Sequence, residues 1–134
     1  MLVEYARNVL GLGDADHAET SPEAETPVVS ALACSLVGQT HPVSILPDTR
    51  AAELYGTKRS DESFYCSYGL NPGYREQLES SGLRVSGIDD EGDVRIAELV
   101  DHPFYLGTLF IPQSGPRRGA PHPVLQGFAV AAGA

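Results

Sequence analysis

The stretch over residues 104–113, with the sequence Phe-Tyr-Leu-Gly-Thr-Leu-Phe-Ile-Pro-Gln, constrains the fold of this chain more than any other segment. Its aromatic, apolar and β-branched residues run up to Pro112, and proline cannot donate to a sheet ladder. The run therefore predicts a buried strand over residues 104–110 with a turn at its carboxyl end. Because α/β proteins bind their ligands at the carboxyl ends of strands, we expect a functional site at this turn.

The rest of the chain predicts alternating helices and strands. Apolar periodicity and capping residues predict helices over residues 1–10, 50–55, 73–80 and 122–132. Runs rich in β-formers predict strands over 28–37, 43–46, 64–70, 83–88 and 94–100, the first two paired as a hairpin. The acidic segment 14–25 is predicted to be a solvated loop. We expect one α/β domain over residues 1–134, with a mixed sheet, several antiparallel hairpins and flanking helices.

Composition excludes several classes of partner. The 134 residues include 9 basic and 18 acidic side chains, and no basic cluster is longer than a pair such as Arg117-Arg118. A net charge of -9 argues against binding to nucleic acid or to an anionic membrane surface. No apolar run approaches the roughly 18 residues of a membrane span, and the first residues do not resemble a secretory signal. We therefore expect a reduced, cytoplasmic protein.

The reactive residue types show no pattern of a metal or cofactor site. Cys34 and Cys66 are far apart and match no metal-ligand spacing, so both are predicted to be small buried hydrophobes within strands. The acidic run Asp89-Asp90-Glu91-Gly92-Asp93 lacks the length and alternation of a calcium loop and predicts a hairpin turn. We expect no metal ion and no cofactor.

The four histidines divide into two predicted groups. His102 and His122 each precede a proline and are predicted to cap turns. His17 and His41 are predicted to lie on the surface in polar loops.

Five segments, in their order along the chain, resemble the carboxyl half of the glutaminase domain of CTP synthase, a class I glutamine amidotransferase. They are residues 83–87 (Leu-Arg-Val-Ser-Gly), 96–99 (Ile-Ala-Glu-Leu), 102–105 (His-Pro-Phe-Tyr), 110–113 (Phe-Ile-Pro-Gln) and 122–128 (His-Pro-Val-Leu-Gln-Gly-Phe). The helix over residues 4–11 is similar to the one that follows the nucleophile elbow of that family. The segments around Cys34 and Cys66 look closer to a bacterial offshoot related to the CTP synthase carboxyl-terminal region.

The resemblance implies a site whose catalytic positions have changed. The family hydrolyses glutamine with a Cys-His-Glu triad and supplies ammonia for conversion of UTP to CTP. By the resemblance, the nucleophile elbow would precede Met1, so we expect this sequence to be truncated and to lack the elbow. The histidine position is Ile111, whose side chain cannot accept a proton, and the glutamate position is Gln113.

The resemblance also implies weakened binding of glutamine. Residues 62–68 correspond to a family stretch that is rich in arginine and histidine and holds the carboxylate of glutamine. Here Ser63, Tyr65 and Ser67 replace basic side chains, which removes the charge-assisted bonds that fix a carboxylate. A remaining pocket is predicted to be lined by Glu62, Tyr65, Cys66, Tyr68 and Phe110.

Three functions follow from these observations. The first is a catalytically inactive remnant, or pseudoenzyme, that serves as a regulatory or interaction module. The second is an incomplete sequence of an active amidotransferase-like protein of pyrimidine biosynthesis, and the third is a small-molecule binding domain. If residue 1 is the native start, the first helix and a sheet edge would be exposed, which favours a homo-oligomer or a partner that completes the sheet.

Overall fold

The computed structural model describes residues 1–114 and 119–133, and the Arg117-Arg118 pair lies outside them. In this part of the chain the helices are α1 (Leu2–Asn8), α2 (Arg50–Tyr55), α3 (Arg75–Ser80) and α4 (Pro123–Ala131). The strands are β1 (Ala15–His17), β2 (Thr26–Ala31), β3 (Gln39–Ile45), β4 (Arg59–Phe64), β5 (Tyr68–Leu70), β6 (Leu83–Ile88), β7 (Val94–Leu99) and β8 (Leu106–Thr108). Single turns of 3₁₀-helix cover Pro72–Tyr74 and Pro112–Ser114.

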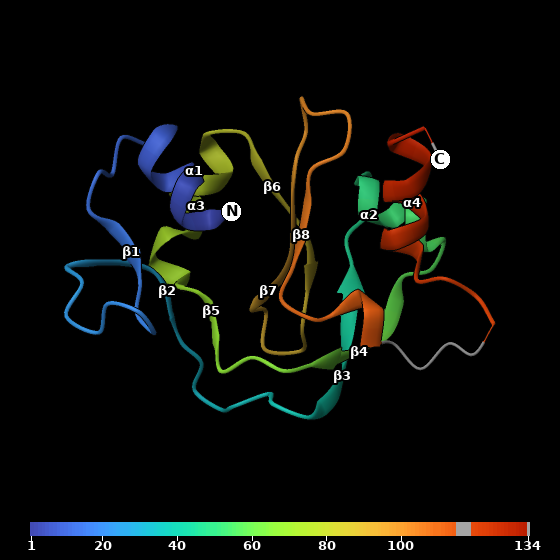
Figure 1. Cartoon of the computed structure of the whole chain (residues 1–134), viewed down its shortest axis with the longest axis horizontal. Helices are drawn as coiled ribbons and strands as arrows, with labels where there is room; N and C mark the ends of the chain where they lie inside the picture. The colour runs from blue at the N-terminus through green and yellow to red at the C-terminus, as the bar shows by residue number, and fades with distance from the viewer. Residues whose placement is uncertain (115–118, 134) are drawn as a thin grey trace.

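The strands form two separate sheets, which confirms the predicted α/β fold with mixed pairing. A three-stranded sheet has the order β1-β2-β5, with β1 parallel to β2 and β5 antiparallel to it. A five-stranded antiparallel sheet has the order β4-β3-β6-β7-β8. Figure 1 shows α1 and α3 beside the small sheet, and α2 and α4 together at the opposite end, next to β3 and β4. In the order of the larger sheet, β8 is the last strand and pairs with β7.

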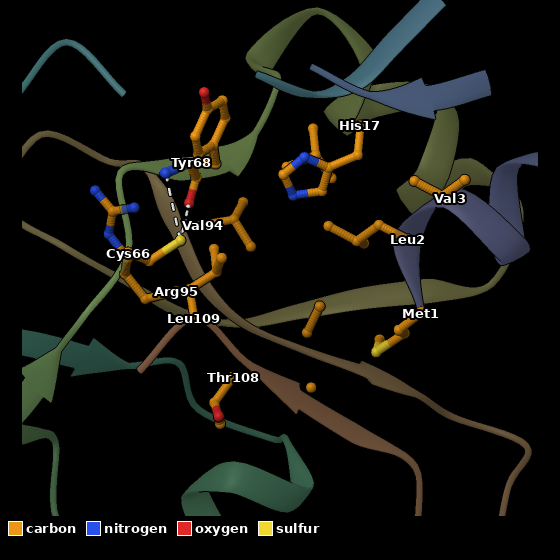
Figure 2. A pocket seen from close by; sticks show the side chains of 13 residues that line it. Met1, Leu2, Val3, His17, Cys66, Tyr68, Val94, Arg95, Thr108 and Leu109 are labelled. Atoms are coloured by element: carbon orange, nitrogen blue, oxygen red, sulfur yellow. Dashed lines mark hydrogen bonds between the residues drawn. The ribbon is translucent and has the colours of Figure 1, made fainter. Parts of the chain in front are cut away.

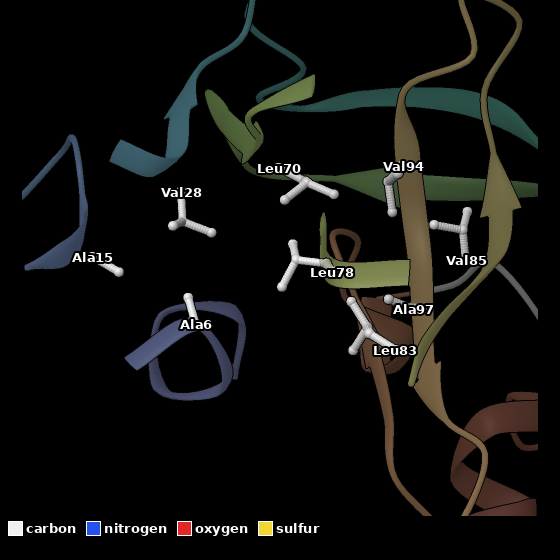
Figure 3. Packing of buried hydrophobic residues seen from close by; sticks show 9 residues of the cluster. All are labelled: Ala6, Ala15, Val28, Leu70, Leu78, Leu83, Val85, Val94 and Ala97. Atoms are coloured by element: carbon white, nitrogen blue, oxygen red, sulfur yellow. The ribbon is translucent and has the colours of Figure 1, made fainter. Parts of the chain in front are cut away.

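Each end of the molecule has its own hydrophobic cluster. The first joins α1, the small sheet and one part of β6 and β7, as the side chains in Figure 3 show. Its fully buried members include Ala6, Val28, Leu78 and Leu83. The second cluster joins α2, α4 and the strands β3, β4 and β7, and includes Phe64 and Phe110, whose rings pack edge to face with centroids 5.7 Å apart. The candidate site residues lie in the second cluster and in a cavity beside α1.

Capping residues set the local structure where the sequence predicts it. Helix α2 begins after Thr49, whose hydroxyl accepts from the Ala52 amide, and it ends at Gly56 with φ of 62°. Helix α4 begins after His122, whose Nδ1 accepts from the Val124 amide, so the predicted capping role of this histidine is confirmed. His102 caps its turn in the same way, accepting from the Phe104 amide.

The acidic turn between β6 and β7 is also confirmed as a hairpin turn. Asp89 Oδ1 accepts from the amides of Glu91 and Asp93, at 3.1 and 2.8 Å. Its Oδ2 accepts from Nε of Arg95 at 2.8 Å, and Arg95 is 4 % exposed. The carboxylate therefore neutralises a buried guanidinium and shapes the turn.

Two predicted strands are wrong in extent and pairing. The predicted strand 28–37 ends at Ala31, and it pairs with β1 and β5 rather than forming a hairpin with residues 43–46. The predicted strand 64–70 is two strands, because the chain leaves the larger sheet at Phe64 and joins the smaller one at Tyr68. Sequence propensity does not predict such a switch, since residues 64–68 (Phe-Tyr-Cys-Ser-Tyr) contain no proline or glycine that would mark the end of a strand.

Four further predictions are corrected by the structure. The run 104–110 contains a strand of three residues, half-buried at a sheet edge, rather than a long buried strand. The segment 14–25 contains β1, so His17 lies in a strand and is half-buried, and His41 lies in β3. Cys34 is exposed in a turn, and Cys66 is half-buried between β4 and β5. For β1, β3 and β8, pairing with other strands decided the environment, whereas both cysteines lie in connections between strands.

Candidate functional site

The turn that follows β8 carries no acid or base in the described residues. Phe110 points into the second cluster and is 3 % exposed, whereas Ile111 is 40 % exposed and Gln113 is also exposed. The Ile111 amide donates to the carbonyl of Ser63 at 3.2 Å, which ties the turn to the end of β4. The backbone therefore presents residue 111 to solvent at the carboxyl end of β8, where the sequence predicted a functional turn, but the side chain there is aliphatic.

The five residues predicted to line one pocket lie in three places. Glu62 and Phe110 are buried in the second cluster, between β4, α2 and α4. Cys66 and Tyr68 line a cavity that lies toward α1. Tyr65, which directly precedes Cys66 in the sequence, is 56 % exposed. The change of sheet explains this distribution, because the chain leaves the larger sheet at Phe64 and joins the smaller one at Tyr68.

A buried polar cluster surrounds Glu62, which is 1 % exposed. Its Oε1 accepts from the Tyr55 hydroxyl at 2.9 Å, and its Oε2 accepts from Nε2 of His122 at 3.0 Å. Since Nδ1 of His122 accepts from a backbone amide, the ring proton of the neutral imidazole is on Nε2. Burial alone would raise the pKa of Glu62, but hydrogen bonds from His122, Tyr55 and Ser60 outweigh it and hold the pKa below its usual value.

This cluster joins β4, α2 and α4 and does not form a reaction site. Both imidazole nitrogens of His122 are engaged, and each carboxylate oxygen of Glu62 accepts a hydrogen bond. Neither residue is accessible to a substrate, because their side chains are 4 % and 2 % exposed. We conclude that Glu62 holds the amino-terminal end of α4 against β4 through its hydrogen bond with His122.

A cavity of about 230 Å³ lies between α1, β5 and the edge strand β8. Figure 2 shows side chains of these elements facing it, among them Leu2, Tyr68 and Thr108, together with His17 of β1 and Val94 of β7. Its full lining is Met1, Leu2, Val3, His17, Val29, Cys66, Tyr68, Val94, Arg95, Ala97, Gly107, Thr108 and Leu109. Most of these residues are apolar, so the cavity favours an apolar occupant.

The polar groups of the cavity wall are engaged in local hydrogen bonds. The Cys66 thiol donates to the Tyr68 carbonyl at 2.9 Å and accepts from the Tyr68 amide at 3.3 Å, as the dashed lines in Figure 2 mark. Nδ1 of His17 accepts from the Glu19 amide, and its ring packs on Tyr68 with centroids 5.3 Å apart. No hydrogen bond joins the thiol and the imidazole within the described chain, so they do not form a nucleophile and base pair.

Sequence reasoning missed most of this cavity. The sequence predicts a helix for Met1, Leu2 and Val3 and a surface loop for His17. No local pattern marks these residues as neighbours of Gly107, because the contact joins segments about 100 residues apart in the sequence. Within residues 1–114 and 119–133, no group of three or more His, Cys, Asp or Glu residues could hold a metal ion. No helix in the same residues is long and apolar enough to cross a membrane.

Comparison with known proteins decides the relationship. CTP synthase from Geobacter sulfurreducens is 38 % identical over 141 residues, and CTP synthase from Thermococcus gammatolerans is 40 % identical over 142 residues. Each alignment covers 98 % of this chain. A solved Trypanosoma brucei CTPS glutaminase domain with bound acivicin matches 98 % of this chain with a TM-score of 0.89 and 26 % identity. The chain is homologous to the glutaminase domain of CTP synthase.

The extent of the match also matters for function. The chain spans 26 % of the length of the Geobacter CTP synthase and 56 % of the Trypanosoma glutaminase domain chain. No family model matches the chain. The homology with this glutaminase domain confirms the resemblance inferred from residues 83–128 and the α/β fold inferred with it.

Proposed function

We propose that this CTP synthase glutaminase homologue does not hydrolyse glutamine and that it acts as an interaction module. The observation that supports the proposal is the turn after β8, which presents Ile111 and Gln113 to solvent. Glutamine hydrolysis by a triad needs a base that takes the proton of the nucleophile and a carboxylate that orients this base. An aliphatic side chain and a neutral amide perform neither role.

Other residues do not replace the missing base. His122 is the nearest buried histidine to this turn, with its ring 5.9 Å from that of Phe110, but both of its nitrogens already have partners. Loss of the histidine of a hydrolytic triad lowers turnover by about 10⁶-fold in a well-studied protease. Such a loss would leave at most the residual rate, about 10³–10⁴-fold above the uncatalysed reaction, that substrate binding and an oxyanion hole provide.

The substrate contacts support the same proposal. Ser67 donates to or accepts from Ser35 at 2.8 Å between their hydroxyls, and Tyr65 faces solvent. Neither residue offers the positive charge that a free α-carboxylate requires. Supply of ammonia for pyrimidine biosynthesis, the alternative function, would need a different base and a different carboxylate clamp.

Ammonia release from glutamine tests this proposal directly. The purified protein is incubated with glutamine, and ammonia is measured in a coupled assay beside an active CTP synthase. We expect no release above the buffer background. Turnover that persists in the double variant Cys34→Ala/Cys66→Ala would refute the proposal and also exclude both cysteines as nucleophiles.

A second measurement uses acivicin, which is bound in the Trypanosoma glutaminase domain. We expect neither a change of thermal midpoint nor a change of intact mass when acivicin is added to this protein. A stoichiometric adduct would show that a reactive nucleophile is present and would contradict the proposal.

A further inference from the structure

Two of the connections between the small sheet and the larger sheet lie side by side. Residues 32–38 lead from β2 to β3, and residues 65–67 lead from β4 back to β5. Figure 1 shows both connections running between the small sheet and the strands β3 and β4. Each connection contains one of the two cysteines of the chain, Cys34 in the first and Cys66 in the second.

Backbone hydrogen bonds hold the two connections together on both sides of Cys34. The Leu32 amide donates to the Ser67 carbonyl at 2.9 Å. The Leu36 amide donates to the carbonyl of Cys66 itself at 3.1 Å. Cys34 is therefore two residues away from a direct backbone partner of Cys66, and two residues span at most about 7 Å.

The side chains that follow the two cysteines already meet. The hydroxyls of Ser35 and Ser67 form a hydrogen bond of 2.8 Å, and each serine directly follows one of the cysteines. A disulfide needs Cα atoms about 4.4–6.8 Å apart. The bend from Ala33 to Ser35 is exposed, so Cys34 can move to this separation without disturbing a packed core.

The two thiols differ in their access to an oxidant. Cys34 is exposed, and both of its neighbours in the sequence are exposed as well. Cys66 is half-buried, and its sulfur makes hydrogen bonds with the amide and the carbonyl of Tyr68. Because oxidation of cysteine depends on exposure, a small oxidant reaches Cys34 first.

We propose that Cys34 and Cys66 form a reversible disulfide when the protein meets a peroxide. The Cys34 sulfur attacks one oxygen of hydrogen peroxide, which breaks the O–O bond, gives a sulfenic acid and releases one water. The Cys66 sulfur then attacks the sulfenic sulfur, so that the S–S bond forms, the S–O bond breaks and a second water leaves. The two thiols lose two electrons and two protons, and these reduce the peroxide to two molecules of water.

The crosslink would tie together the junction of the two sheets. It encloses residues 34–66, which contain β3, α2 and β4, and it closes this segment where both of its ends pass into the small sheet. A closed loop of this size lowers the conformational entropy of the unfolded chain and so stabilises the folded one. The proposal concerns oxidation and holds whether or not the protein hydrolyses glutamine.

Peroxide treatment with matched serine variants tests the proposal. The reduced protein is treated with hydrogen peroxide, catalase stops the reaction, and the remaining thiols are counted by labelling with N-ethylmaleimide and intact-mass measurement. Cys34→Ser and Cys66→Ser each keep one thiol and change only one atom of the side chain. Circular dichroism establishes that each variant is folded before it is oxidised.

The wild-type monomer of 14.3 kDa is expected to lose both labelling sites and about 2 Da, and dithiothreitol should restore both sites. A digest should contain the Cys34 peptide linked to the Cys66 peptide. The thermal midpoint of the oxidised wild type should rise by about 5 °C or more above that of the reduced protein. Cys66→Ser should instead gain about 16 Da as a sulfenic acid on Cys34, and Cys34→Ser should remain reduced at the same dose.

Three results would overturn the proposal. Wild type that only gains oxygen, or that forms only disulfide-linked dimers, would show that the two cysteines do not pair within one chain. A disulfide that leaves the thermal midpoint unchanged or lowers it would contradict the tie between the sheets. Oxidation of Cys34→Ser at the rate of the wild type would contradict the assignment of Cys34 as the thiol that meets the peroxide.

Discussion

Replacing Glu62 by glutamine is expected to destabilise the fold strongly, although the two side chains have nearly the same shape. The carboxylate accepts from the Tyr55 hydroxyl on one oxygen and from Nε2 of His122 on the other. A glutamine keeps one acceptor oxygen and turns an NH₂ donor toward the other donor. Hydrogen bonds to an ionised group contribute about 1.5–3 kcal/mol each, so loss of one bond and the unpaired buried donors together cost about 2–4 kcal/mol.

Urea unfolding followed by far-ultraviolet circular dichroism measures this loss. A decrease of 2–4 kcal/mol is a large part of the roughly 5–15 kcal/mol that stabilise a typical domain, so the midpoint should shift clearly. Asp61→Asn is the control, because Asp61 is the exposed neighbour of Glu62 on β4 and its substitution should change stability by less than about 0.5 kcal/mol. If Glu62→Gln unfolds at the same urea concentration as Asp61→Asn, the structural role assigned to the carboxylate is wrong.

Three further perturbations have defined expected results. Acidification should destabilise the wild type more than Glu62→Gln, because folding lowers the pKa of Glu62 below 4.5. The ionised carboxylate makes its full contribution to folding stability above the unfolded pKa, and this contribution is lost as the pH falls through the folded pKa. Gly87→Ala should cost about 1–3 kcal/mol, since the added Cβ would lie 2.7 Å from Cγ1 of the fully buried Ile96, whereas Gly13→Ala has nothing within 4 Å and should be close to neutral. Glu98→Ala should cost about 1–3 kcal/mol, because this 3 % exposed carboxylate accepts from the first two amides of α2 at 3.0 and 3.2 Å.

The same urea titrations decide these three expectations. Parallel pH profiles for wild type and Glu62→Gln would contradict the assigned direction of the pKa shift. Equal midpoints for Gly87→Ala and Gly13→Ala would show that Ile96 can move aside. For Glu98→Ala, the exposed Asp101→Asn is the control, and equal stability of the two variants would remove the capping role of Glu98.

Local chemistry predicted the elements whose ends are set by their own residues. The helix over 50–55 begins at a threonine cap and ends at a glycine with positive φ, both of which are visible in the sequence. The β6–β7 hairpin follows from an acidic turn between two apolar runs, and its strands lie within one residue of the predicted bounds. These elements need no information from distant parts of the chain.

Elements that depend on distant partners were predicted poorly. Strand β1 has the sequence Ala-Asp-His and forms only because β2 lies parallel to it. Strand β4 contains Arg, Ser, Asp and Glu, and it is stabilised by pairing with six residues of β3. Propensity is low in both strands, and tertiary pairing overrides it.

For the site, side-chain identity alone predicts what the turn after β8 lacks. Ile111 cannot accept a proton and Gln113 carries no charge wherever the chain places them, because these are properties of the residues themselves. Only the tertiary structure places Met1 to Val3 opposite Gly107 in the lining of one cavity. The cavity is created by segments about 100 residues apart, and periodicity within a short window contains no information about such contacts.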